Sequence, residues 1–244
     1  MYSPGKNYQL TDLLKKVDAG DMNAMSEIVS LIAAEGYLKD PQEIDIQDRY
    51  ITYLEMLSTS GDSEAYIMLG DAYKDGTGVS QDPQKAVAWY EKAAGAGEPF
   101  GNECIGMMYY DGDVIPQDYQ KAFTYFTKTD GRKSFCTLYA LGEMYRCGYY
   151  IEQDGSKACE YYQKIVYSDE QFAFLDDYYW RACFRLACAY HYGTGVERNL
   201  NLASKVLEKA HQLRSERSYD TVSDIPDDEF FCELAKLNQD RGLL

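Results

Sequence analysis

The sequence has few of the residues that most catalytic and metal sites require. Its 244 residues include two histidines, and the C-x-x-C, H-E-x-x-H, G-x-x-x-x-G-K-[ST] and G-x-S-x-G motifs are all missing. Cys188 and His191 stand one helical turn apart, but a metal site needs three or four ligands and no second cluster is evident. We therefore expect no catalytic residues, no metal site and no cofactor.

Positive charge and long apolar runs are also scarce. Lys and Arg total 24 against 40 Asp and Glu, which gives a formal net charge of -16. This charge repels phosphate backbones and anionic lipids, so it argues against nucleic acid and membrane partners. No stretch approaches the roughly 18 apolar residues that span a bilayer, and the start has no apolar signal segment. We expect a soluble, cytoplasmic protein.

What the sequence does contain is a repeat. A small residue followed three positions later by tyrosine recurs at intervals of 36, 36, 36 and 45 residues, in the pairs Ala34/Tyr37, Gly70/Tyr73, Gly106/Tyr109, Gly142/Tyr145 and Ala187/Tyr190. A second signature, with a basic residue before a small one and an aromatic pair, follows in register, for example as Lys85-Ala86 and Trp89-Tyr90. Two signals that keep the same offsets indicate a repeat protein.

Each copy predicts two helices joined by a glycine-containing turn. A glycine three residues after the tyrosine, such as Gly76, suits the left-handed conformation that ends a helix. Asp82 and its equivalents, Asp118, Asp154 and Asn199, are suited to cap the second helix. Gly70 costs helix propensity, which indicates close approach of the partner helix.

Such a helix pair cannot bury its own apolar face, so the pairs must stack. We expect an all-α fold, an α/α solenoid forming a right-handed superhelix of antiparallel helix pairs. The expected repeats span about 22–61, 62–97, 98–134, 135–175 and 179–215, preceded by an N-terminal half-repeat, so that the solenoid covers 1–215. An acidic connector and a C-terminal capping helix, with Phe230, Phe231, Leu234 and Leu237 at helical spacing, then fill 216–244. The nine extra residues near 167–177 predict an irregularity between the last two repeats.

The clearest copy, AYIMLGDAYKDGTGVSQDPQKAVAWYEKAAGAG at 65–97, resembles the Sel-one-like repeat (SLR) family, a relative of the tetratricopeptide repeat (TPR) family. The resemblance implies an adaptor or scaffold that binds other proteins. Some secreted members carry a disulfide at fixed repeat positions, but no cysteine position recurs in this chain. We expect reduced thiols, most of them buried as small hydrophobic residues.

If the first helices line the concave side, as in tetratricopeptide arrays, the residues flanking the tyrosine stripe form a partner-binding groove. By register these are Ile67, Asp71, Lys74, Met107, Tyr110, Asp111, Tyr139, Glu143, Arg146, Phe184, His191 and Tyr192. Tyrosine offers a large contact area with a polar group, but the signature tyrosines are core packing positions. Tyr110, Tyr139 and Tyr192 are as well suited to the core as to the groove.

Three functions stay open at this point. The first is a non-enzymatic scaffold or adaptor whose groove binds a protein or peptide, preferably one with basic residues, because the chain is acidic. The second is an inhibitor or immunity protein that neutralises a basic toxin. The third is an enzyme, which the missing motifs argue against. The sequence does not predict the oligomeric state.

Overall fold

The structure of the chain is a computed structural model that describes residues 12–35, 44–128, 134–168, 177–215 and 227–240. Within these ranges all regular secondary structure is α-helical, so the predicted all-α fold class is confirmed. The chain divides into two compact units, one formed by residues 1–118 with 128–130, the other by 119–127 with 131–244. No helix in the described ranges is both long and apolar enough to cross a bilayer.

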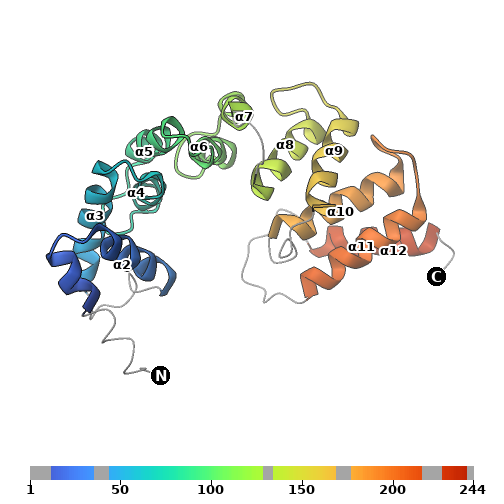
Figure 1. Cartoon of the computed structure of the whole chain (residues 1–244). Coiled ribbons are helices and arrows are strands. Elements are labelled where there is room, and N and C mark those ends of the chain that lie inside the picture. Colours follow the sequence, from blue (N-terminus) through green and yellow to red (C-terminus); the bar gives the residue numbers. More distant parts are fainter. Residues whose placement is uncertain (1–11, 36–43, 129–133, 169–176, 216–226, 241–244) are drawn as a thin grey trace. The chain divides into compact units, whose positions relative to one another are not determined.

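The first unit consists of helices that pack against their neighbours in sequence (Figure 1). After a helical segment at 12–18 come α2 (Met22–Glu35), α3 (Ile44–Thr59), α4 (Ser63–Asp75), α5 (Pro83–Gly95) and α6 (Phe100–Asp111). Leu13 and Val17 of the first segment are buried in one cluster with Met25, Leu54 and Leu69. The N-terminal segment thus covers the first helices of the array, as a half-repeat should.

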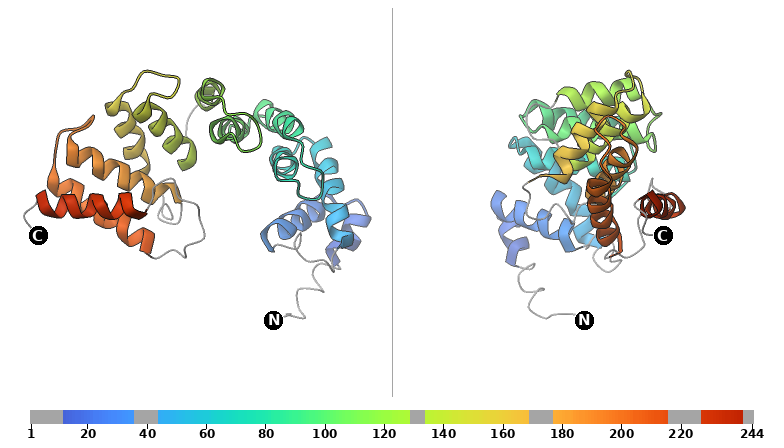
Figure 2. Two further views of the ribbon diagram at one scale, coloured as in Figure 1. Left: turned by 180° about the vertical axis from the view of Figure 1, so that it is seen from behind. Right: turned by 90° about the vertical axis from the view of Figure 1, so that its right-hand side faces the viewer.

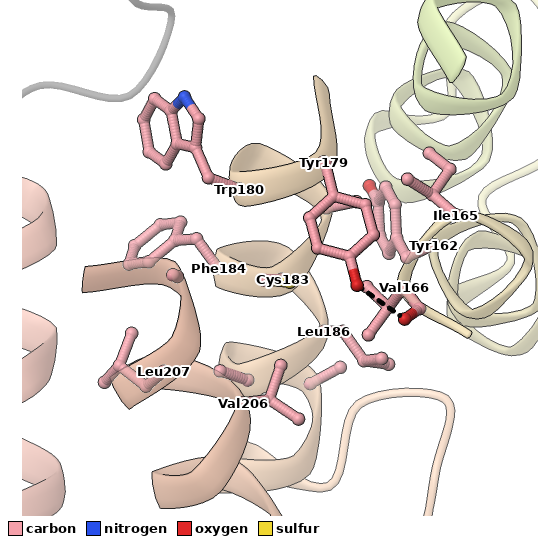
Figure 3. Packing of buried hydrophobic residues seen from close by; sticks show 14 of the residues in the cluster. Tyr162, Ile165, Val166, Tyr179, Trp180, Cys183, Phe184, Leu186, Val206 and Leu207 are labelled. Atoms are coloured by element: carbon pink, nitrogen blue, oxygen red, sulfur yellow. Dashed lines mark hydrogen bonds between the residues drawn. The ribbon is translucent and has the colours of Figure 1, made fainter. Parts of the chain in front are cut away.

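The second unit continues the pairing (Figure 2). Its helices are α7 (Tyr119–Lys128, all but its last residue), α8 (Phe135–Cys147), α9 (Gly155–Val166), α10 (Asp177–Tyr192), α11 (Leu200–Ser215) and α12 (Asp227–Asp240). Here α8 pairs with α9 and α10 with α11, while α9 also packs against α10. Figure 3 shows Tyr179 of α10 beside Tyr162, Ile165 and Val166 of α9, with the Tyr179 hydroxyl donating to the Val166 carbonyl at 3.0 Å.

The same turn closes four of the repeats. The glycine that ends each first helix has φ between +73° and +75°, at Gly76, Gly112, Gly148 and Gly193. The N–H of the residue before each second helix donates to the carbonyl of the signature tyrosine at 2.8–2.9 Å, in the pairs Asp82/Tyr73, Asp118/Tyr109, Asp154/Tyr145 and Asn199/Tyr190. The predicted helix caps are confirmed at Asp82, Asp154 and Asn199. The side-chain Oδ1 of each accepts a hydrogen bond from the backbone N–H three residues later in the chain, at 3.0–3.1 Å.

The small residue of the first signature makes room for a ring from the second helix. A Cβ added at Gly70 would lie 2.3 Å from Cε1 of Tyr90, and one at Gly142 would lie 2.5 Å from Cε1 of Tyr162. In the last repeat the position equivalent to Tyr90 and Tyr162 is Leu207, which is smaller, and the position equivalent to the glycine is Ala187. The predicted close approach of the two helices is confirmed at both glycines.

Several predictions concern residues outside the described part. These are the Tyr37 signature, the insertion at 169–176, most of the acidic connector and the side chains of Phe230, Phe231 and Leu234. Leu237 is described and is buried, as expected for a capping helix.

The expectation that most cysteines are buried is wrong, because Cys159 and Cys183 are buried whereas four others are half-buried and Cys232 is exposed. The repeat keeps no fixed cysteine position, so the thiols fall on different faces of the helices.

Candidate functional site

Two of the residues expected in a groove are acceptors for the tyrosine of the second helix. The hydroxyl of Tyr90 donates to Oδ1 of Asp71 at 2.7 Å, and that of Tyr162 donates to Oε1 of Glu143 at 2.5 Å. The sequence register explains the pairing, because the repeats with Phe126 or Leu207 in place of the tyrosine have Met107 or Cys188 in place of the acid. The acid therefore belongs to the contact between the paired helices.

Glu143 is the buried centre of a charge network. Its two oxygens accept from Nε and Nη2 of Arg146 at 2.8 and 2.6 Å, and Nε of Arg185 lies 3.2 Å from Oε1. Burial raises the pKa of Glu143, but the hydrogen bonds from Arg146 and the charge of Arg185 outweigh it, so the pKa lies below its usual value. Burial, followed by the charge of Glu143, raises the pKa of Tyr162 well above its usual value. Glu143 is thus held as a carboxylate and Tyr162 as a neutral donor.

Five of the twelve expected groove residues have buried side chains. These are Ile67, Tyr139, Glu143, Phe184 and His191, with exposed fractions between 0% and 9%. The expectation that Ile67, Glu143, Phe184 and His191 project into an open groove is therefore wrong, and Tyr139, which suited either the core or the groove, lies in the core. Tyr139 packs between Tyr162 of α9 and Tyr178 of α10, and Phe184 lies within the cluster formed by α8 to α11 (Figure 3). Neighbouring helix pairs cover these positions, which the register of a single repeat cannot anticipate.

His191 is buried for a different reason, because α12 lies against the end of α10. Its Nδ1 is 2.5 Å from Oε1 of Glu233 and its Nε2 is 3.0 Å from Oδ2 of Asp240. The hydroxyl of Tyr192 donates to Oε2 of Glu233 at 2.7 Å, and Nη2 of Arg198 donates to Asp240 at 3.0 Å. The capping helix is therefore joined to α10 and the following turn by polar contacts as well as by Leu237.

The other seven expected residues keep at least part of their side chains at the surface. Asp71, Lys74, Met107 and Tyr110 of the first unit are half-buried, as is Arg146 of the second, whereas Asp111 and Tyr192 are exposed. Although Asp111 as a residue is exposed, partial desolvation of its carboxyl group, followed by the charge of Asp113, raises its pKa to about 6. Lys74 lies 3.5 Å from both Asp71 and Asp75. The surface of the first unit at these positions is thus mainly acidic.

A pocket of about 500 Å³ lies among α8, α9, α10 and α12 of the second unit. Three of the twelve expected residues, Arg146, Phe184 and Tyr192, line it. Arg185, Glu233 and Lys236 also line it, and the repeat register did not predict them. The volume lies within the range of small-ligand pockets, roughly 300–1,000 Å³. This pocket is the candidate functional site.

Three cysteines also line the pocket, namely Cys159, Cys188 and Cys232. Burial raises the pKa of Cys159 to about 11, so this thiol stays protonated at neutral pH and is a weak nucleophile and a weak metal ligand. Among the described residues no group of three or more His, Cys, Asp or Glu side chains is arranged to hold a metal ion. The pocket is suited to binding through charge and aromatic surface.

Some of the residues that shape this site had a sequence signal and others had none. Gln153 lines the pocket and recurs, at intervals of 36, as Gln117 and Gln81 of the first unit. These three residues donate from Nε2 to the carbonyls of Arg146, Tyr110 and Lys74 at 2.7–2.8 Å. That spacing could have revealed their role in the turn. Arg185, Glu233 and Lys236 have no counterpart in the other repeats, so the repeat pattern gives no reason to select them.

Comparisons with known proteins agree with the repeat architecture. The model of the Sel1 repeat matches residues 63–98, 105–129, 137–166 and 180–210, which together make up half of the chain. A protective antigen of uropathogenic Escherichia coli strains, described as displaying an SLR fold, aligns over 83% of this chain and 48% of its own, with 22% identity and a TM-score of 0.60. A Sel1 repeat protein from Oxalobacter formigenes aligns over 83% of this chain and 55% of its own, with 26% identity and a TM-score of 0.57. This chain thus spans about half the length of both structures, and no curated protein matches it.

Proposed function

The chain belongs to the Sel1 repeat family, and from this membership we propose that it is a non-enzymatic scaffold or adaptor that binds a protein or peptide partner. Sel1 repeat proteins generally mediate protein–protein interaction. The observation that carries the proposal for this chain is the pocket of the second unit, where a half-exposed Arg146 and an exposed Tyr192 lie together. Arginine and tyrosine are enriched among the residues that dominate binding energy at protein interfaces.

The partner-binding surface that we propose consists of the expected residues with accessible side chains. In the first unit these are Asp71, Lys74, Met107, Tyr110 and Asp111, and in the second they are Arg146 and Tyr192. The net charge of -16 supports a partner with basic residues, because complementary charge speeds association. The seven free thiols support a reducing compartment such as the cytoplasm.

The proposal is tested by affinity capture with the full chain followed by identification of the bound protein and titration of its affinity with salt. We expect a discrete partner whose affinity falls between 50 and 500 mM salt, because screening weakens exposed charge pairs. Tyr192→Ala should weaken binding of that partner. Tyr167→Ala is the matched control, since Tyr167 is 57% exposed against 52% for Tyr192 but does not line the pocket.

Two outcomes would count against the proposal. Failure to capture any protein reproducibly would contradict the proposed binding function itself. A partner whose affinity does not change with salt concentration would contradict only the proposed preference for basic partners. Capture of a cationic toxin, with loss of its toxicity on binding, would favour the inhibitor function, which rests on the same net charge.

A further inference from the structure

Positive charge gathers at the pocket of the second unit although the chain as a whole is strongly acidic. Arg146, Arg185 and Lys236 contribute three cationic side chains to its wall. The carboxylates beside them are Glu233, which also lines the pocket, and Glu143, which contacts both arginines. Among the described residues that line the pocket or contact its arginines, three cations stand against these two carboxylates, so the local charge is positive.

Both carboxylates are engaged by other side chains of the protein. Glu143 accepts from Arg146 and from the hydroxyl of Tyr162. Glu233 accepts from the hydroxyl of Tyr192 and contacts His191. These contacts are internal, and the two side chains are only 7% and 8% exposed, so a cationic ligand has little access to either carboxylate.

Two of the cations keep donors for a ligand. A guanidinium group has five N–H donors, and two of those of Arg146 bond Glu143, with no other acceptor for the side chain in the described part of the chain. The ammonium of Lys236 is 4.0 Å from Oε2 of Glu233, which is beyond hydrogen-bond distance. The side chains of Arg146 and Lys236 are 42% and 61% exposed, so a ligand can reach both.

Tyr192 provides an aromatic surface at the same pocket. Its ring stacks on His191 with centroids 4.5 Å apart, and its hydroxyl is fixed by Glu233, yet the side chain is 52% exposed. A ring already held in place loses little conformational freedom when a ligand packs on it. An apolar group beside an anionic group would therefore contact Tyr192 at a low entropic cost.

We infer that this pocket binds an acidic side chain, Asp or Glu, of a peptide partner, with a neighbouring apolar residue of that peptide packed on Tyr192. The inference rests on the proposed function and names the residue by which the partner is anchored. It is compatible with a partner that is basic overall, because the long-range charge of the chain guides approach, whereas groups in contact decide which side chain enters the pocket.

Selection of a random twelve-residue peptide library against the immobilised full chain tests the inference. We expect the selected peptides to align on one Asp or Glu with an apolar neighbour. The acidic chain by itself would select Lys-rich and Arg-rich peptides, so an aligned acidic residue is a result that net charge does not produce. For a selected peptide, replacing that Glu by Gln should raise Kd about tenfold, since a hydrogen bond to a charged group contributes roughly 1.5–3 kcal/mol and 1.4 kcal/mol is a factor of ten.

Variants of the chain then locate the binding site. Arg146→Lys with Lys236→Gln should abolish the preference for the acidic residue, whereas Lys205→Gln, an equal charge change on the exposed surface of α11, should preserve it. Melting temperatures of all three proteins confirm that they are folded. If the double variant is unfolded, Lys236→Gln alone serves as the test, because the ammonium of Lys236 approaches Glu233 only to 4.0 Å and its loss should not unfold the protein.

The outcomes separate the inference from the proposed function. Peptides that share a basic or neutral residue, or an acidic preference that survives in the pocket variants, would overturn the pocket inference and leave peptide binding intact. Failure to select any peptide, together with failure to capture any protein partner, would overturn both. An acidic preference that disappears only in the pocket variants supports the inference.

Discussion

The hydroxyl of Tyr162 on α9 donates to Oε1 of Glu143 on α8 at 2.5 Å, and both side chains are buried. This contact joins the two helices of one repeat and also links them to α10, because Arg185 of α10 lies 3.2 Å from the same oxygen. One carboxylate therefore connects α8, α9 and α10 through Tyr162 and Arg185.

Tyr162→Phe should destabilise the second unit by about 1.5–3 kcal/mol, because it removes a hydrogen bond to a charged, buried acceptor. Denaturant unfolding of the full chain measures the change. Tyr161→Phe is the matched control, since Tyr161 is half-buried and stacks on Tyr145, and its expected change is within about 0.5 kcal/mol. Equal losses in the two variants would show that the Tyr162 hydroxyl does not stabilise the fold.

The charge of Glu143 should make stability depend on pH in the acidic range. Its pKa in the folded protein is lowered from the usual 4.5, so the unfolded chain binds the proton more readily. The stabilisation is fully present above pH 4.5 and is lost as pH falls through the folded-state pKa. Glu143→Gln cannot titrate, so its stability deficit relative to the wild type should be largest near pH 6 and shrink below pH 4.5. Urea unfolding at several pH values measures this difference, and a deficit independent of pH would contradict the prediction.

Gly70→Ala should destabilise the first unit by about 1–3 kcal/mol, because the new Cβ would overlap the ring of Tyr90. The ring has little room to move, since its hydroxyl is bonded to Asp71. Gly95→Ala on α5 is the control, because a Cβ there meets nothing within 4 Å. This control should be neutral or stabilising by up to about 1 kcal/mol. Thermal unfolding compares the two, and a neutral Gly70→Ala would refute the close approach.

His191→Gln should loosen α12 without unfolding the repeats. The variant alters the contacts of His191 to Glu233 and Asp240, and these join α12 to α10. Hydrogen exchange of the segment 227–240 should become about tenfold faster or more, since local opening depends on the contacts that hold the segment. His211→Gln replaces the exposed histidine of α11 and should leave this exchange unchanged. Unaltered exchange in His191→Gln would mean that Leu237 and the remaining contacts hold the helix alone.

The sequence predicted those features that depend on neighbouring residues along the chain. The left-handed glycine at 76, the caps at Asp82 and Asp154, and the fit of Gly70 to a partner helix all follow from local geometry or from the period of the repeat. These features recur because each repeat has the same turn and the same packing of its second helix on its first. The helical fold could therefore be predicted from one sequence.

The exposure of the candidate groove residues was decided by the tertiary structure. Register placed Tyr139, Phe184 and His191 on an open face, yet helices from the next pair and from α12 bury them. The pocket likewise brings together Arg146 and Lys236, which lie ninety positions apart and belong to no common repeat. A repeat pattern describes one helix pair and its period. The burial and the charge partners of a side chain also depend on residues of other helices that pack against it.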